Sequence, residues 1–314
     1  MSVVSPIRAT NRDVVTPLWP RRTSHSHPAN PTSPAHPSSP AHPARPGQGA
    51  RWVTQLGRTL HPFSDDEPRR SALARRTREH PVWNDVSIDL GGLPVLLVGG
   101  LASTPNTFDV MQEWLVRVNA RPHLAPVRYG VDCGERTARQ VADEAHRLAA
   151  LTGRRCVLVG HSRGGQFARA VAVRHRAAVR GLVTLATPIN RLVGVRPTLR
   201  AELVLLGALG TLGVPDLVRA SCLWGTCCRE LRADIQAAVP ADLPYLSVYS
   251  PQDELVRWRS CLDPWARHST VAASHSGMLS SPDVLQVLAD ELRAYDGPGA
   301  ADAQAPAAAR PMVA

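Results

Sequence analysis

The sequence contains no lysine, and all 36 of its basic side chains are arginine. With 26 acidic residues, the formal net charge is +10, which raises the question of nucleic-acid binding. Residues 1–80 hold 12 Arg against 5 acidic residues, whereas residues 81–314 hold 24 against 21. Aromatic residues make up only 4% of the chain, so bases would find few stacking partners. We therefore predict no nucleic-acid partner, and binding of the arginine-rich N-terminal part to nucleic acid or to an anionic membrane is the weaker alternative.

Long hydrophobic runs are also missing. The N-terminus has no uninterrupted apolar stretch of the kind found in signal peptides. The most apolar run, Leu203 to Leu212, is about half the length that a membrane-spanning helix needs. These absences predict a cytoplasmic protein without a membrane span, and they leave its oligomeric state open.

The six cysteines are too few to require a disulfide framework in a chain of 314 residues. The pair Cys227-Cys228 has neither Cys-x-x-Cys spacing nor a nearby histidine, so the spacing predicts no metal site, and no cofactor motif is seen. Cys133, Cys228 and Cys261 fall in loops that we expect on one face of the fold. A disulfide among these three residues remains open.

The middle of the chain alternates short apolar runs with amphipathic stretches, which is typical of a mostly parallel sheet covered by helices on both faces. Pro- and Ser-rich or Ala-rich tails at residues 1–80 and 297–314 lack this pattern and are predicted to be disordered. We therefore predict one α/β domain over residues 81–296. About fifty residues, 189–242, interrupt the alternation and are predicted to form a helical cap over the site. The expected strands are Leu93–Val98, Leu124–Tyr129, Cys156–Val159, Leu182–Ala186, Leu246–Tyr249 and Thr270–Ala273.

One strand leads directly into a catalytic motif. The segment from Gly160 through His161, Ser162 and Arg163 to Gly164 fits the pattern Gly-x-Ser-x-Gly. In this motif a sharp turn between a strand and a helix exposes the serine hydroxyl above the sheet, and small residues avoid backbone clashes. Because an apolar strand precedes it and an apolar-striped helix follows it, we predict that Ser162 is a nucleophile.

A serine nucleophile needs a base to accept its proton and an acid to orient the base. In this architecture both follow the serine along the chain, each on a loop beyond a later strand. Asp253 follows the strand LSVY and His275 follows the strand TVAA, so we predict Asp253 as the acid and His275 as the base. Glu254 and Asp263 are the competing acids. The other histidines are less suited, because they fall on helices, before strands or inside the turn: His123, His146, His161, His175 and His268.

Acyl transfer also needs backbone amides that stabilise the developing oxyanion. The residue after the nucleophile, Arg163, would supply one amide. The turn that follows the strand ending at Val98 would supply the other, most plausibly from Leu101, because Gly99 and Gly100 leave the backbone free to face the site.

The segments LLVGGLAS, VLVGHSRGGQFARA, LVTLATPIN, SVYSPQDELV and SHSGML together resemble the bacterial esterase and lipase branch of the α/β-hydrolase superfamily, in particular its lipase-like actinobacterial members. The resemblance covers about residues 80–295. It implies Ser162 as nucleophile, Asp253 as acid, His275 as base, and Leu101 and Arg163 as oxyanion amides. Two departures are the sequence Gly99-Gly100 where many lipases have His-Gly, and the absence of His-x-Gly after LATPIN.

The predicted function is hydrolysis of a small carboxylic ester, with a lipophilic acyl group, through an acyl-enzyme. Acyl transfer to an alcohol or amine would use the same residues and is one alternative. A binding protein that has the fold but no activity is another.

Overall fold

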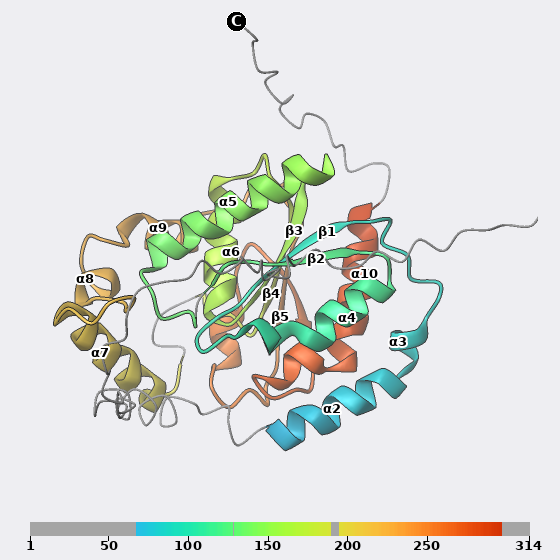
Figure 1. Cartoon of the computed structure of the whole chain (residues 1–314), viewed down its shortest axis with the longest axis horizontal. Coiled ribbons are helices and arrows are strands. Elements are labelled where there is room, and N and C mark those ends of the chain that lie inside the picture. The colour runs from blue at the N-terminus through green and yellow to red at the C-terminus, as the bar shows by residue number, and fades with distance from the viewer. Residues whose placement is uncertain (1–66, 128, 190–194, 297–314) are drawn as a thin grey trace, which may run out of the picture. The chain divides into compact units, whose positions relative to one another are not determined.

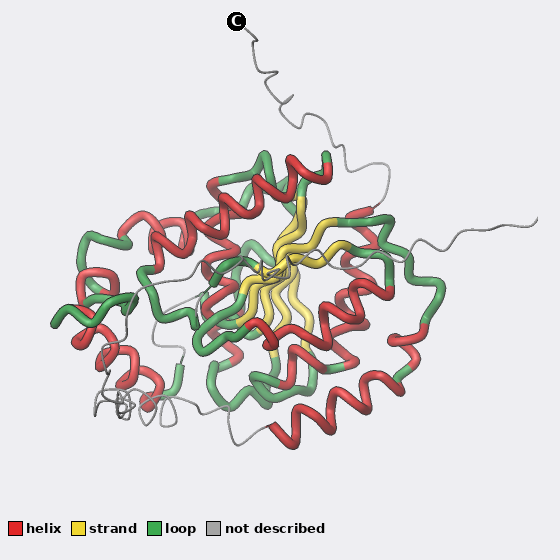
Figure 2. Tube along the Cα trace, viewed as in Figure 1, coloured by secondary structure: helices red, strands yellow, loops and turns green. Residues whose placement is uncertain are grey.

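The computed structural model describes residues 67–127, 129–189 and 195–296. Its core is a six-stranded sheet in the order β2-β1-β3-β4-β5-β6, and every neighbouring pair is parallel. Figure 2 shows the strands at the centre with helices on both sides. The predicted α/β class is therefore confirmed. The strands are β1 (Pro94–Val98), β2 (Arg121–Leu124), β3 (Cys156–His161), β4 (Val179–Leu185), β5 (Tyr245–Tyr249) and β6 (Arg267–Thr270).

The central strands are buried on both faces, which explains their continuous apolar runs. Their side chains alternate between two separate cores. Val95 and Val157 belong to one core, and their neighbours Leu96 and Leu158 belong to the other. The sheet thus separates two hydrophobic layers, each of which needs a cover of helices.

One layer is covered by helices α3 (Pro81–Asn84), α4 (Asp109–Arg117) and α10 (Pro282–Asp296), together with the short 3-10 helix Gly277–Ser280. The other is covered by α5 (Gly134–Thr152) and α6 (Arg163–Arg174). Two further 3-10 turns, Pro105–Phe108 and Trp258–Cys261, lie in connections. Figure 1 shows α5 and α6 on one side of the sheet and α4 and α10 on the other.

A segment between β4 and β5 adds helices to the α5 and α6 side of the fold. It contains α7 (Pro197–Thr211), α8 (Ala220–Leu223) and α9 (Arg229–Gln236), which we call the cap segment. Buried side chains of all three helices join the same core as α5 and α6. The segment lies within the predicted cap of residues 189–242, of which residues 190–194 are outside the described part of the chain.

Two edge strands differ from the prediction. The strand expected at Leu124–Tyr129 is β2, which ends at Leu124, and the strand expected at Thr270–Ala273 is β6, which ends at Thr270. Both are partly exposed edge strands with polar residues, so their sequences lack the apolar run that marks the central strands. As a result, His268 lies within β6 rather than before it.

The N-terminal boundary also differs from the prediction. Residues 1–80 were expected to be disordered, but Glu67–Glu79 forms helix α2. Thr77 is fully buried, and its hydroxyl donates to Ser280 O at 2.5 Å. The sequence of this helix offers few apolar residues for packing, and the contact with a distant segment helps to hold it in place. The remaining predicted tails, residues 1–66 and 297–314, lie outside the described residues.

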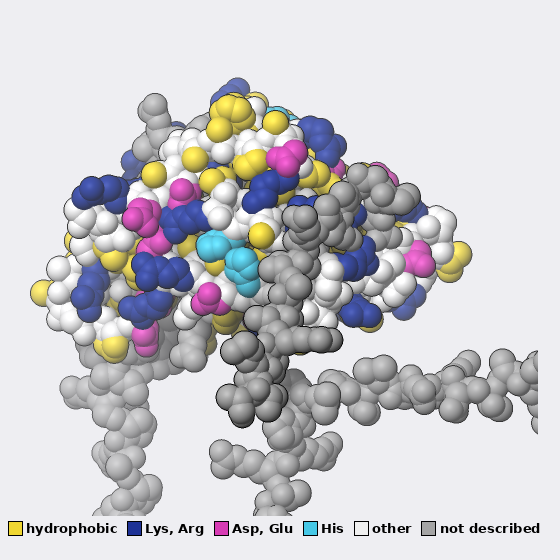
Figure 3. Space-filling view, turned by 90° about the horizontal axis from the view of Figure 1, so that it is seen from above, with side chains coloured by type: hydrophobic (Ala, Val, Ile, Leu, Met, Phe, Trp, Pro, Cys, Tyr) yellow, Lys and Arg dark blue, Asp and Glu magenta, His cyan; other side chains and the backbone are white. Residues whose placement is uncertain are grey.

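Charge on the folded part is mixed, as its composition predicts. On the face presented in Figure 3, arginine side chains are interspersed with Asp and Glu and form no single basic patch. Within the described ranges, none of the helices combines the length and apolar character needed to cross a membrane.

Candidate active site

Ser162 occupies a strained turn between β3 and α6. Its backbone has φ 55° and ψ −128°, a region that residues with side chains rarely adopt and that is often associated with functional sites. The Ser162 N–H donates to Leu185 O of the neighbouring strand at 2.8 Å, which holds the turn to the sheet. This is the geometry that the Gly-x-Ser-x-Gly pattern requires.

The flanking glycines allow very close backbone packing at this turn. A methyl group on Gly160 would lie 2.5 Å from Gly165 Cα, and one on Gly164 would lie 2.1 Å from Val98 O. Any larger residue at either position would push the helix away from the sheet. The turn is therefore positioned by contacts that only glycine permits.

His275 and Asp253 form a buried pair at the same edge of the sheet as Ser162. Asp253 lies beyond β5 and His275 beyond β6, and the carboxyl ends of parallel strands share one edge. His275 Nδ1 lies 2.7 Å from Asp253 Oδ2, and both side chains are almost fully buried. Asp253 Oδ1 accepts from the N–H groups of Leu255 and Val256 at 2.8 Å each, which orients the carboxylate.

The two competing acids have other partners. Glu254 Oε2 accepts from the backbone N–H of His275 at 3.1 Å, so it contacts the chain of His275 but leaves its ring to Asp253. Asp263 is fully buried and pairs with Arg169 at 2.6 Å inside the core. Of the three acids considered, Asp253 is therefore the one that contacts the histidine ring.

Within the described residues, no hydrogen bond joins the Ser162 hydroxyl to the His275 ring. The two are linked through His161, which precedes Ser162 and whose ring centre lies 4.6 Å from that of His275. His161 Nε2 is 3.0 Å from His275 O. Catalytic hydrogen bonds are often long in the absence of substrate, so this geometry is compatible with a serine and base that approach on binding.

His161 has a structural role that the sequence pattern did not reveal. Burial, reinforced by the charge of His275, lowers its pKa to about 3. The ring is therefore neutral near neutral pH, and its Nε2–H donates to His275 O. His161 holds the backbone of His275 in place, although it occupies the variable position of the motif.

The two residues predicted to supply oxyanion amides, Leu101 and Arg163, line the same cavity as Ser162. Gly100 packs against the turn so closely that a methyl group there would lie 3.0 Å from both Arg163 N and Ser162 Cβ. Arg163 opens α6, and amides in the first turn of a helix have no acceptor within the helix. The N–H of Leu101 makes no backbone hydrogen bond within the described residues. The Leu101 amide therefore lacks a backbone partner among the described residues, as an oxyanion donor would.

The side chain of Arg163 supports the loop that contains Leu101, the other residue predicted to supply an oxyanion amide. Its guanidinium donates to Gly130 O at 2.6 Å and to Asp132 O at 3.3 Å. Tyr129 O in turn accepts from Ala102 N at 2.7 Å. Burial lowers the pKa of Arg163, and the charges of nearby cysteines oppose that shift. Arg163 thus connects the turn at Ser162 to the segment that precedes α5.

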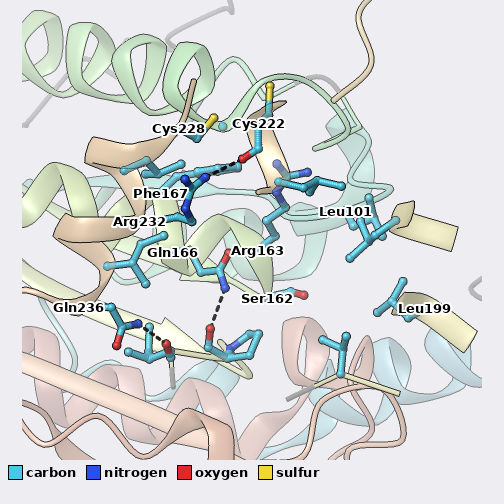
Figure 4. Close-up of a pocket in the computed structure, with 18 residues that line it drawn as sticks. Leu101, Ser162, Arg163, Gln166, Phe167, Leu199, Cys222, Cys228, Arg232 and Gln236 are labelled. Atoms are coloured by element: carbon cyan, nitrogen blue, oxygen red, sulfur yellow. Dashed lines mark hydrogen bonds between the residues drawn. The ribbon is translucent and has the colours of Figure 1, made fainter. Parts of the chain in front are cut away.

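A cavity of about 240 Å³ opens beside Ser162, between the sheet and the cap segment. Figure 4 shows the Ser162 hydroxyl pointing into the space between Leu101 and Leu199. Most of the lining is apolar and comes from α6, from the cap segment and from the loops at its ends; it includes Phe167, Pro188, Ile189, Val195, Leu199, Leu203, Leu223, Leu231 and Ile235. Such a cavity suits a small lipophilic group.

Within the described residues, one group of side chains could hold a metal ion. It consists of Cys133, Cys222, Cys227 and Cys228, two of which line the cavity. No disulfide links them. Of the three cysteines for which a disulfide was left open, Cys133 and Cys228 lie 3.7 Å apart, whereas Cys261 is buried in a separate cluster with Val195 and Val256.

No protein-family model matches the sequence, and a search among curated proteins also finds no match. Solved structures do match. The mature lipase BlEst2 of Bacillus licheniformis aligns with a TM-score of 0.51 and 16% identity over 65% of this chain and 93% of that chain. Lipase B of Aspergillus fumigatus aligns with a TM-score of 0.48 and 18% identity over 66% of this chain and 55% of that chain. The parallel sheet and the alignment with the mature Bacillus lipase show that the chain has the α/β-hydrolase fold.

Proposed function

We propose that the protein is a serine hydrolase that cleaves carboxylic esters. The observation that carries the proposal is the strained backbone of Ser162 between β3 and α6, beside an apolar cavity. A buried His–Asp pair at the same edge of the sheet supports it, because a serine hydroxyl needs such a base. The similarity in fold to a bacterial lipase is consistent with this class of reaction.

In the proposed mechanism, Ser162 Oγ attacks the ester carbonyl while His275 Nε2 takes its proton. Asp253 keeps the His275 ring in the required tautomer and stabilises its positive charge. The amides of Leu101 and Arg163 bind the oxyanion of the tetrahedral intermediate. The imidazolium then protonates the leaving alcohol, and water, activated by the same base, releases the acid from Ser162.

The shape of the cavity favours esters whose acyl group is small and lipophilic. Its apolar lining lies next to Ser162, so an acyl chain that entered it would bring the carbonyl to the hydroxyl. Transfer of the acyl group to another alcohol would use the same residues, and no specific feature of the cavity favours it.

The test is a series of p-nitrophenyl esters of increasing acyl length, hydrolysed by the wild type and by Ser162→Ala. We expect turnover with short and medium chains, a decline for long chains, and loss of turnover in the variant. Ser87→Ala, which alters an exposed serine far from the cavity, should retain full activity. Equal turnover by Ser162→Ala and wild type would contradict the proposal. Product that shifts to a new ester when a competing alcohol is added would indicate acyl transfer.

A further inference from the structure

Four cysteines from distant parts of the sequence converge beside the cavity. Cys133 immediately precedes α5, Cys222 lies on α8, and Cys227 and Cys228 immediately precede α9. Their sulfur atoms all lie within 4.8 Å of one another. We call these residues the four-cysteine cluster. Figure 4 shows two of its members, Cys222 and Cys228, at the edge of the cavity.

Three of the six sulfur–sulfur distances match a tetrahedral metal site and do not match disulfides. The distance is 3.6 Å for Cys133 and Cys227, 3.7 Å for Cys133 and Cys228, and 3.6 Å for Cys222 and Cys227. A disulfide would bring two sulfur atoms to about 2.05 Å. Four sulfurs held at about 2.3 Å from a central zinc ion stand about 3.8 Å apart, close to the separations found here.

One member of the cluster lies at the positive end of a helix, because Cys133 immediately precedes the first turn of α5. Amide hydrogen bonds and the positive end of a helix dipole both stabilise a negatively charged sulfur. Such donors are needed because four thiolates and one divalent cation carry a net charge of −2.

Two arginines supply positive charge nearby. Arg232 Nη1 donates to Cys222 O at 2.9 Å, and the Arg163 guanidinium binds the backbone of Asp132, next to Cys133. Figure 4 shows the Arg163 and Arg232 side chains between the cysteines and Ser162. The charge of a metal–thiolate centre would thus be balanced within the cavity wall.

We infer that the four-cysteine cluster is a structural zinc site that fastens the cap segment to the start of α5. A thiolate tetrahedron selects zinc or iron, and with four protein ligands it leaves no open position for catalysis. On binding, each thiol releases its proton to solvent and its sulfur binds the ion, and no electron is transferred. The spacing of Cys227 and Cys228 alone did not predict this site, because the other two ligands are distant in sequence.

The position of the site explains what the metal would do. Gly134 lies so close to α9 that a methyl group on it would stand 2.6 Å from Leu231 Cδ2. Glu135 also accepts from Leu231 N at 3.1 Å. A metal at the cluster would therefore hold α8 and α9, which line the cavity, at a fixed distance from the start of α5.

The test is elemental analysis of the full-length protein purified under reducing conditions without chelators, and then reconstituted with zinc chloride. We expect one zinc ion per chain. Replacement of zinc by cobalt should produce the intense thiolate-to-cobalt absorption of a tetrahedral sulfur site. Both measurements use the wild type, so they do not depend on whether a variant folds.

Variants supply the controls. Cys133→Ser and Cys222→Ser should lower zinc affinity at least tenfold in competition with a chromophoric chelator. Cys156→Ser and Cys261→Ser, which alter buried cysteines outside the cluster, should leave it unchanged. Reduced wild type that binds no zinc, an intact mass that reveals disulfides among the four cysteines, or iron in place of zinc would overturn the inference.

Discussion

The two walls of the cavity are built in different ways. The sheet wall carries Ser162 and, behind it, His275 and Asp253 on loops that continue from buried strands. The cap wall consists of helices that leave large apolar side chains exposed, such as Leu205 at 47% and Trp224 at 62%. In the proposed mechanism the chemistry thus depends on the sheet wall, whereas the shape of the binding space depends on the helices of the cap segment.

Ion pairs also attach the cap segment to the rest of the fold, in addition to the proposed zinc site at the four-cysteine cluster. Glu135 on α5 pairs with Arg174 on α6 at 2.6 Å, and Arg174 also pairs with Asp234 on α9. Burial alone would raise the pKa of Glu135, but its hydrogen bond and ion pair with Arg174 lower it overall. Changes to the sheet wall should therefore abolish turnover in a folded protein, and changes to the cap wall should alter stability and selectivity.

The largest effect is expected from the acid of the sheet wall. Asp253→Asn should lower kcat by roughly 10⁴-fold, because the amide cannot hold the tautomer of His275 that accepts a proton. Steady-state ester hydrolysis checks this result. Asp263→Asn is the matched control, since it disturbs the buried pair with Arg169.

The control variant should show the opposite behaviour. Loss of the Asp263 charge leaves Arg169 buried without its ion-pair partner and should destabilise the fold by about 3 kcal/mol, while the folded protein keeps its kcat. If Asp263→Asn lost turnover while Asp253→Asn kept it, the roles assigned to the two acids would be reversed.

The next largest effect concerns the attachment of the cap. Removal of zinc by a strong chelator should lower the melting temperature by about 10 °C, because an ion that binds only the folded state stabilises it. Differential scanning fluorimetry checks this shift. The Cys133→Ser variant should melt at the lower temperature with or without chelator. A wild-type melting temperature that the chelator does not change would argue against attachment of the cap by zinc.

A smaller effect should follow from narrowing the cavity. Leu203 lines the cavity on α7, whereas Leu205 on the same helix faces away and is exposed. Leu203→Phe should reduce kcat/KM for the longest esters about tenfold relative to the shortest, and Leu205→Phe should not. Equal selectivity in the two variants would show that acyl chains bind elsewhere.

The last prediction concerns the pH dependence of stability due to His161. Its pKa is about 3 when folded and near its ordinary value of 6.5 when unfolded, so only the unfolded state takes up the proton in between. Stability contributed by this group is therefore present above pH 6.5 and is lost as the pH falls toward 3.

His161→Gln tests this sign, because the amide can donate to His275 O but does not titrate. From pH 7.5 to 5 the wild type should lose roughly 2 kcal/mol more than the variant, or about 4–8 °C in melting temperature. His268→Gln, which alters an exposed histidine, should behave as the wild type. Identical pH profiles for all three proteins would refute the role of His161.

The same contrast between sheet and cap governs what could be predicted from the sequence. The strand beginning at Cys156 was predicted well, because a strand buried on both faces has a continuous apolar run, and a helix was correctly expected after the turn at Ser162. The edge strand Arg267–Thr270 was misplaced by three residues, because an exposed strand has no such run. The α/β fold itself is confirmed, and the assignment of Ser162, Asp253 and His275 as catalytic residues stays a prediction.

The cysteine cluster lay beyond sequence reasoning for a different reason. Its members are at positions 133, 222, 227 and 228, and only the packing of α5 against α9 brings the first close to the last. The role of His161 was hidden in a similar way, since its contact with residue 275 joins positions 114 residues apart in the sequence. Long-range contacts of this kind leave no spacing signal along the chain.

The most direct test of the catalytic account is to map the site of covalent labelling by a fluorophosphonate, which reacts with activated serines. Peptide mass spectrometry should find the phosphonyl group on Ser162 alone, with labelling lost in Ser162→Ala and kept in Ser87→Ala. Folded wild-type protein that stays unlabelled, or that carries the label on another residue, would contradict the assignment of Ser162 as the nucleophile.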